Sequence, residues 1–151
     1  MYDYKQVLFI LDQDGSEFPP TSLERLWGSP LETGHFRIEN IPFYVMGISA
    51  GDEITVSETN NELYFDALVK PSGNSTFRLF STDPARIGSI RDHLAMLGCA
   101  SELNQLVGVI AVEVPHDISI KPFLDYIVEA KEAGDLDLDF DEGALHHEIE
   151  I

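Results

Sequence analysis

Four aspartates stand at every second position near the end of the 151-residue chain, in the stretch Asp135–Asp141. Leu136, Leu138 and Phe140 separate them. Because successive side chains of a strand point to opposite faces, this spacing predicts a strand with carboxylates on one face and apolar side chains on the other. Neighbouring carboxylates of such a strand lie roughly 6–7 Å apart. A row of this kind can bind cationic side chains and can stand in for a phosphate backbone.

The aspartates belong to a strongly acidic end of the chain. From Asp125 to Ile151 there are ten acidic residues and one basic residue, Lys131, so this stretch supplies nine of the eighteen net negative charges. A net charge of −18 repels phosphate and anionic lipid, and we therefore expect no direct binding to nucleic acid or membrane. Two explanations stay open: solubility, and steering toward a basic partner surface.

The leading functional hypothesis is a non-catalytic protein that binds another protein. Most concretely, it predicts an immunity protein or inhibitor that occludes the basic active cleft of a bacterial toxin. The strand edge could also pair directly with a strand of the partner. A structural explanation stands beside it, because charged side chains protect an edge strand from unwanted pairing. The residues expected to contact the partner are Asp135, Asp137, Asp139, Asp141 and Glu142.

The alternative hypothesis is a small-molecule site between the two halves of the chain, as in a regulatory domain or an unrecognised enzyme. Arg78 and nearby hydroxyl groups could hold a small anion in a chain poor in cations. The competing explanation is that these polar residues make a turn and that Arg78 pairs with a nearby carboxylate. The candidate ligand-binding residues are Arg78, Asn74, Ser75, Thr76 and Tyr44.

Two segments have the residue types of known functional motifs, but the residues around them do not fit the structure that each motif requires. Gly47–Gly51 reads G-x-S-x-G, yet the strand-like Asp52–Val56 follows where a nucleophile elbow needs a helix. Asp137–Glu148 has acidic residues at the first, third, fifth and twelfth positions of a calcium loop, but Glu142 replaces the glycine that the sharp turn requires. We therefore predict a β-turn at Gly47–Gly51 and a strand at the alternating aspartates. We predict no catalytic residue, cofactor or metal site.

The remaining reactive side chains lack a useful spacing. Adjacent His146 and His147 rarely chelate a metal together, because neighbouring side chains diverge, so a solvated tail is predicted over 144–151. Cys99 follows a helix stop and is predicted to be a small buried hydrophobe rather than a nucleophile. The other histidines are isolated in the sequence: His35, His93 and His116.

The first half of the chain has the pattern of short strands separated by turns. The predicted strands are Val7–Leu11, Leu23–Leu31, His35–Ile41, Ile54–Ser57 and Leu63–Val69. The second of them, which contains Trp27, could instead hold one helical turn. Tandem asparagines at 60–61 tolerate the positive φ of a hairpin turn. Five short strands predict a small antiparallel, barrel-like sheet over residues 1–70.

The second half mixes helical and strand patterns. The predicted strands are Thr76–Ser81, Cys99–Leu103, Val107–Val114 and the aspartate-faced strand. One helix is predicted from Thr82-Asp83-Pro84 to Gly98, and another from Ser119 to Gly134. The order β-α-β-β-α-β is that of ferredoxin-like domains, which places the fourth strand at a sheet edge. The predicted class is α+β, with a ferredoxin-like lobe over 71–143 that follows the barrel through a hairpin at Pro71–Asn74.

Composition indicates a folded, soluble protein. An apolar fraction of 44% is enough for a sizeable core. A single cysteine permits no intramolecular disulfide and fits a reducing compartment. No stretch has the length of a membrane span and the N-terminus lacks a signal-peptide pattern, so we expect a cytoplasmic location.

Short motifs along residues 7–143 also form a recognisable set. They are Leu26-Trp27 with Pro30-Leu31, Asn40–Phe43, Gly51-Asp52, Pro71–Thr76 with Arg78, and Leu97–Cys99. As a set they resemble a bacterial family of small uncharacterised proteins, classed as a domain of unknown function. The resemblance implies a bacterial cytoplasmic protein. It transfers no catalytic residue, because none is established for the family.

Overall fold

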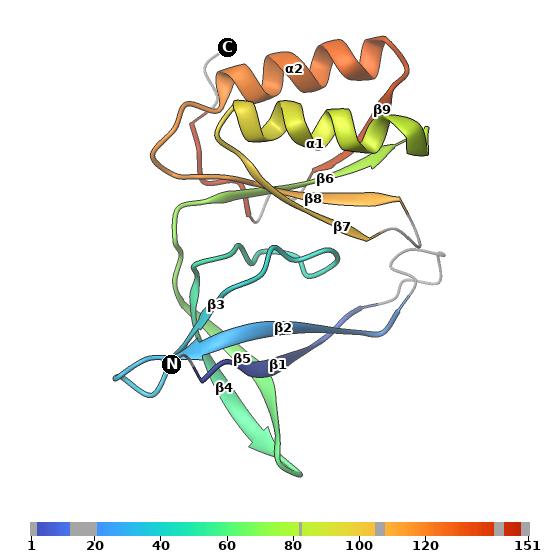
Figure 1. The fold of residues 1–151 in the computed structure, drawn as a ribbon. Helices are drawn as coiled ribbons and strands as arrows, with labels where there is room; N and C mark the ends of the chain where they lie inside the picture. Colours follow the sequence, from blue (N-terminus) through green and yellow to red (C-terminus); the bar gives the residue numbers. More distant parts are fainter. Residues whose placement is uncertain (1–2, 13–20, 82, 105–107, 141–143, 149–151) are drawn as a thin grey trace. The chain divides into compact units, whose positions relative to one another are not determined.

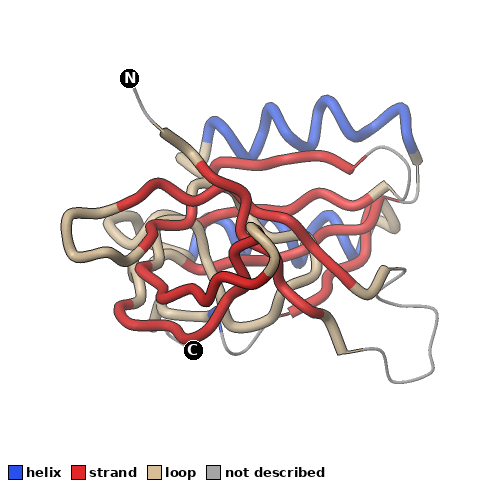
Figure 2. Tube along the Cα trace, turned by 90° about the horizontal axis from the view of Figure 1, so that it is seen from below, coloured by secondary structure: helices blue, strands red, loops and turns tan. Residues whose placement is uncertain are grey.

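The computed structural model describes residues 3–12, 21–81, 83–104, 108–140 and 144–148 (Figure 1). The chain divides into two compact units, residues 1–72 and 73–151. The class is mixed α+β, and strand is the main regular structure, as the red segments of Figure 2 show. The α-helices of the described residues both belong to the second unit.

The first unit is a closed barrel, which confirms the predicted barrel-like sheet, although one of its strand pairs is parallel and not antiparallel as predicted. Its strands are β1 (Lys5–Ile10), β2 (Leu23–Pro30), β3 (Phe36–Ile38), β4 (Glu53–Thr59) and β5 (Glu62–Lys70). Each strand pairs antiparallel with the next, and β1 closes the barrel by pairing parallel with β5, where Val7 lies opposite Leu63. Trp27 is therefore in a strand and not in a helical turn.

Alternating side chains fill the barrel. Val7 and Phe9 of β1 are buried together with Leu26 of β2, because every second residue of a strand points to the same face. The turn between β4 and β5 is made by Asn60 and Asn61 at φ 54° and 66°. These positive φ values are those that the tandem asparagines predicted, and they match the twist of a two-residue hairpin.

The second unit is a four-stranded sheet with helices on one face (Figure 1). Its elements in chain order are β6 (Ser75–Ser81), η1 (Pro84–Arg86), α1 (Ile87–Met96), β7 (Ala100–Asn104), β8 (Val109–Val114), α2 (Lys121–Glu132) and β9 (Leu136–Phe140). The strand order is β7-β8-β6-β9, and all three pairings are antiparallel. The apolar β8 is therefore internal, and β9 lies at an edge, as predicted.

Local signals explain where α1 begins and ends. The Asp83 side chain accepts a hydrogen bond from the Ala85 amide at 3.0 Å, and Pro84 follows it as the first helical residue. The first turn is a 3₁₀ turn rather than the α-helix that the sequence predicted from this point. Gly98 ends the helix at φ 89°, a backbone conformation that glycine adopts without strain.

The predicted hairpin at Pro71–Asn74 is wrong. Strand β5 belongs to the barrel and β6 to the four-stranded sheet, so the two strands do not pair. The segment is instead the connection between the two units, whose boundary lies after Ser72. The same turn-forming residues serve either purpose, because they specify a change of direction and not the pairing that follows.

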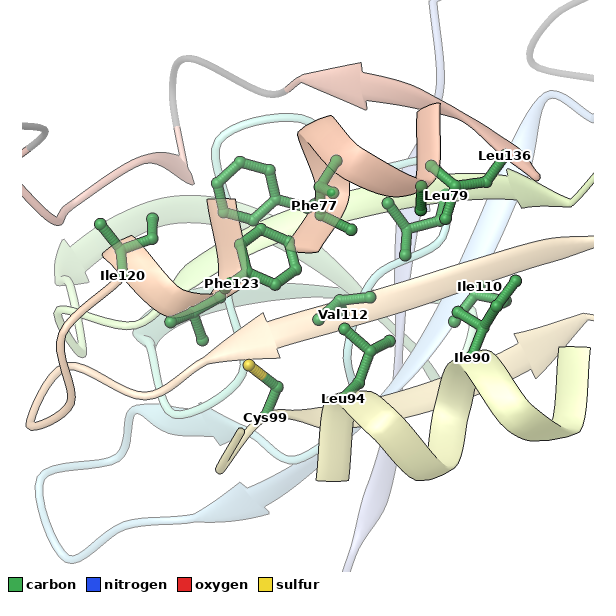
Figure 3. Close-up of a cluster of buried hydrophobic side chains, with 13 residues drawn as sticks. Phe77, Leu79, Ile90, Leu94, Cys99, Ile110, Val112, Ile120, Phe123 and Leu136 are labelled. Carbon is green, nitrogen blue, oxygen red and sulfur yellow. The ribbon is translucent and has the colours of Figure 1, made fainter. Parts of the chain in front are cut away.

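The core of the second unit joins the sheet to both helices (Figure 3). Phe77 of β6 meets Phe123 of α2 with ring centroids 4.8 Å apart. Ile90 and Leu94 bring α1 onto the same core, and Leu136 brings β9 onto it. Burial of each such side chain contributes about 1.5–3 kcal/mol. Leu136 thus fixes which face of β9 turns to the core.

Candidate functional site

The edge strand β9 pairs with β6 in a defined antiparallel register. Asp137 lies opposite Phe80, and Asp139 lies opposite Arg78. Leu136 is buried in the core while Asp137 is exposed, so these two side chains alternate as predicted. The strand assignment also supports the rejection of a calcium loop, whose first half would need a different backbone.

Asp135 lies at the junction between α2 and β9. Its amide donates a hydrogen bond to the Ala130 carbonyl at 2.9 Å, which attaches the start of β9 to the end of the helix. Its carboxylate is 3.4 Å from the guanidinium of Arg86. The predicted partner-binding residues Asp135, Asp137 and Asp139 therefore follow one another along the edge. Asp141 and Glu142 lie outside the described residues.

Arg78 occupies the centre of the sheet, on the face opposite the helices. Its side chain is fully buried, although Phe77 and Leu79 beside it in the sequence point into the helix-covered core. Across the sheet, the register places Arg78 between Asp139 of β9 and Ala111 of β8. A buried guanidinium must be hydrogen-bonded and paired, because its desolvation is otherwise very costly.

Asn74 is the second candidate ligand-binding residue, and it bridges two segments of its own unit. The side-chain Nδ2 of Asn74 donates a hydrogen bond to the Glu113 carboxylate at 3.0 Å. Its Oδ1 accepts one from the backbone amide of His116 at 2.9 Å. Thr76, the second residue of β6, is almost fully buried. Tyr44 belongs to the barrel core of the first unit. Sequence reasoning placed Asn74, Thr76 and Arg78 near one another; β6 holds Thr76 and Arg78, and Asn74 directly precedes this strand.

Ser75 and His147 form a contact that the sequence did not predict. The Ser75 hydroxyl lies 2.6 Å from Nδ1 of His147 and accepts hydrogen bonds from the amides of His146 (2.9 Å) and His147 (3.2 Å). Nε2 of His147 lies 2.8 Å from the Pro115 carbonyl, which can only accept. The ring is therefore protonated at Nε2, and Nδ1 accepts the Ser75 proton.

This contact attaches the chain after β9 to the sheet. Ala144 is fully buried and Leu145 packs against the helix-covered core. The described residues 144–148 therefore differ from the solvated tail that the sequence predicted. A hydroxyl on an imidazole resembles a nucleophile with its base, but the Ser75 hydroxyl is buried and already accepts two amide bonds. We call this group of contacts the C-terminal clip.

Glu24 is a buried carboxylate in the barrel that sequence reasoning also missed. It accepts hydrogen bonds from three successive amides, those of Phe43 (2.8 Å), Tyr44 (2.9 Å) and Val45 (2.9 Å). The loop between β3 and β4 would otherwise bury these donors without acceptors. Glu24 therefore organises this loop, and its inward position on β2 was its only sequence signal.

Cys99 directly precedes β7 and is buried, as predicted. Burial raises the pKa of its thiol to about 11, and the nearby charge of Glu113 acts in the same direction. The thiol therefore stays protonated near neutral pH, and the reactive thiolate is scarce. Among the described residues, no group of three or more His, Cys, Asp or Glu side chains is arranged to hold a metal ion.

Comparisons with known proteins identify a family and a fold. A family described as a domain of unknown function, DUF4265, matches residues 24–138. The crystal structure of a hypothetical protein from Neisseria gonorrhoeae is similar, with a TM-score of 0.75 at 19% identity over 99% of this chain and 98% of that chain. No curated protein matches. Within the described residues, the helices are too short or too polar to cross a membrane.

Proposed function

The chain belongs to the DUF4265 family of unknown function, and we propose that it is a non-catalytic protein that binds a basic partner protein through β9. The partner is a bacterial toxin, and this protein acts as its immunity protein or inhibitor by occluding a basic active cleft. The observation that carries the proposal is the position of β9 at the edge of the sheet with Asp137 exposed on it. A cytoplasmic location fits, because Cys99 is a free thiol.

Two physical effects support an interface at this edge. A strand at a sheet edge presents backbone donors and acceptors on its outer side, to which an extended segment of a partner can add. Regularly spaced carboxylates accelerate the approach of a basic surface and fix its orientation. The same charges oppose pairing of β9 with a second copy of itself, since like charges opposite each other destabilise a strand pair.

The finer description of the second unit is part of the proposal. We propose that residues 71–143 form a ferredoxin-like domain, because the chain order is β-α-β-β-α-β and the sheet order is β7-β8-β6-β9 with antiparallel pairs. In this arrangement the last strand, β9, lies at one edge of the sheet. The fold thereby provides the open edge that the proposed interface needs.

The experiment that tests the function starts by capturing the partner. The tagged protein is incubated with lysate of its source at low salt, and proteins eluted at high salt are identified by mass spectrometry. Association of the purified partner is then measured with Asp137→Asn and Asp137→Lys. We expect slower association at low salt, with the larger effect for lysine and a smaller difference at high salt.

The matched control is Asp117→Asn, which removes the same charge from an exposed loop of the same unit. If only the net charge of the protein mattered, Asp117→Asn and Asp137→Asn would slow association equally. An unchanged association rate for Asp137→Lys at low salt would overturn the proposal. A toxin-activity assay with the partner completes the test, since an inhibitor must lower that activity at stoichiometric amounts.

A further inference from the structure

A pocket of about 290 Å³ lies between the two helices, beside the start of β9. We call it the helix pocket; it is lined by His93, Tyr126, Glu129, Ala130, Ala133 and Asp135. Its volume lies at the lower end of the roughly 300–1,000 Å³ of ordinary small-molecule sites. The size is sufficient for one side chain of another protein.

The helix pocket has an aromatic wall. The rings of His93 on α1 and Tyr126 on α2 stack with centroids 4.0 Å apart and an angle of 11° between their planes. His93 is exposed and Tyr126 is half-buried, so the pair is accessible from solvent. Stacking holds both rings in place, which lowers the entropic cost of binding a ligand against them.

The rest of the lining consists of two alanines and two acidic residues. Glu129 and Asp135 both carry carboxylates, and Glu129 is exposed. Burial raises the pKa of Tyr126, and the negative charge of Asp135 raises it further, which places that charge close to the phenol. Arg86 of the same chain pairs with Asp135 at 3.4 Å, so this carboxylate already binds one guanidinium and an incoming guanidinium would share it.

We infer that the helix pocket receives an arginine side chain of the partner protein, an inference that rests on the proposed function and names how the partner is anchored. A guanidinium stacks on aromatic rings and donates to carboxylates at the same time, whereas a lysine ammonium is a more strongly hydrated point charge. Asp135 belongs to the helix pocket and directly precedes β9. One basic segment can therefore follow the strand edge and anchor its arginine here.

The test uses the full-length protein without any partner. Acetyl-arginine amide is titrated into it while the ring signals of His93 and Tyr126 are followed by NMR. We expect saturable shifts at roughly millimolar concentration, because one side chain offers few contacts. The uncharged analogue acetyl-citrulline amide has almost the same shape and should not bind, and acetyl-lysine amide should bind more weakly than the arginine compound.

A pair of variants localises the binding. Glu129→Gln removes a carboxylate of the helix pocket and should weaken arginine binding about two- to five-fold, the range for an exposed ion pair. Glu132→Gln removes the same charge from an exposed position of α2 that does not line the pocket, and binding should stay unchanged. Both substitutions keep the side-chain shape and are not expected to affect folding.

The inference is overturned if arginine and citrulline amides give the same shifts, or if both variants bind arginine like the parent protein. These outcomes leave the proposed function intact, provided that partner association still depends on Asp137. Conversely, an arginine site without any effect of Asp137 on partner binding overturns the proposed function alone. The two failures are thus distinguishable.

Discussion

The Ser75 hydroxyl lies 2.6 Å from Nδ1 of His147, across 72 residues of sequence. Ser75 is the first residue of β6, and Pro115, the other partner of His147, directly follows β8. The C-terminal clip therefore joins both internal strands of the sheet to the chain after β9. Because β9 has a strand neighbour on one side only in the described sheet order, this attachment also limits how far β9 can shift.

The first prediction concerns the clip. His147→Ala should lower the free energy of unfolding of the second unit by about 1–3 kcal/mol, because the buried Ser75 hydroxyl loses its acceptor and the Pro115 carbonyl its donor. Urea unfolding followed by circular dichroism measures this, since the described α-helices lie in this unit. Trp27 cannot serve as the probe, because the only tryptophan is in the barrel.

The control for the clip is His146→Ala. The side chain of His146 is exposed, and its amide, which contacts Ser75, remains after the substitution. We expect a change within about 0.5 kcal/mol. Equal losses for the two variants would show that a general effect of the tail, and not the imidazole of His147, stabilises the unit.

The second prediction concerns Glu24 in the barrel. Glu24→Ala leaves the amides of Phe43, Tyr44 and Val45 without their carboxylate acceptor, and it should lower stability by about 3 kcal/mol or more. Hydrogen exchange at these three amides should accelerate even under native conditions. Glu24→Gln should have an intermediate effect, because one carbonyl oxygen remains to accept.

The matched control is Arg25→Ala, which changes the exposed neighbour on the same strand. Its effect on exchange at residues 43–45 should be small. If Glu24→Ala leaves that exchange unchanged, the loop between β3 and β4 is held by other contacts and the role assigned to Glu24 is wrong.

The third prediction is slow reaction of Cys99 with thiol reagents. Cys99 is 6% exposed, and the pKa of about 11 of its thiol leaves little thiolate at pH 8. We expect a disulfide reagent to label the native protein slowly and the urea-unfolded protein at once. Rapid labelling without denaturant would contradict the buried position of Cys99.

The fourth prediction is a loss of stability at alkaline pH that depends on Cys99. Its pKa is raised from 9.0 to about 11 on folding, so between these values the folded state holds a proton that the unfolded state has released. Stability therefore falls as pH rises through this window. The decline should be steeper for the parent protein than for Cys99→Ala. Parallel curves would show that the thiol does not contribute.

Sequence patterns predicted the features that depend on local periodicity. The alternation in Asp135–Asp141 predicted a strand whose leucines face a core; the strand is confirmed over Leu136–Phe140, and Leu136 is buried. The tandem Asn60-Asn61 likewise predicted a turn from a backbone preference of the residues themselves. The strand and the turn both depend on residues that are neighbours in the chain, so the residue types alone were enough to predict them.

Features that depend on distant partners had no such signal. His147 looked solvated because its hydrogen-bond partners, Ser75 and Pro115, are far away in the sequence. Glu24 similarly finds its amide donors some 20 residues later. The helix pocket was missed because His93 and Tyr126 lie on different helices and meet only once these pack on one face of the sheet.

The last prediction separates a structural from a ligand-binding role for Arg78. Its side chain is fully buried at an internal strand, with acidic Asp139 opposite it in the register. A guanidinium in this position must be hydrogen-bonded and paired, and removing a charged residue from a buried pair costs about 3–5 kcal/mol. Arg78→Ala should therefore destabilise the second unit by this amount, as measured by urea unfolding.

Arg91 provides the comparison for Arg78. It is half-buried and donates to the hydroxyl and carbonyl of Ser101 at 3.0 Å each, so Arg91→Ala should cost about 1–2 kcal/mol. A larger loss of stability for Arg78→Ala than for Arg91→Ala would show that Arg78 has a structural role in the sheet. If Arg78→Ala instead keeps the parent stability, the guanidinium is not needed for the stability of the second unit. Arg78 would then be the first residue to test for the binding of a small anion.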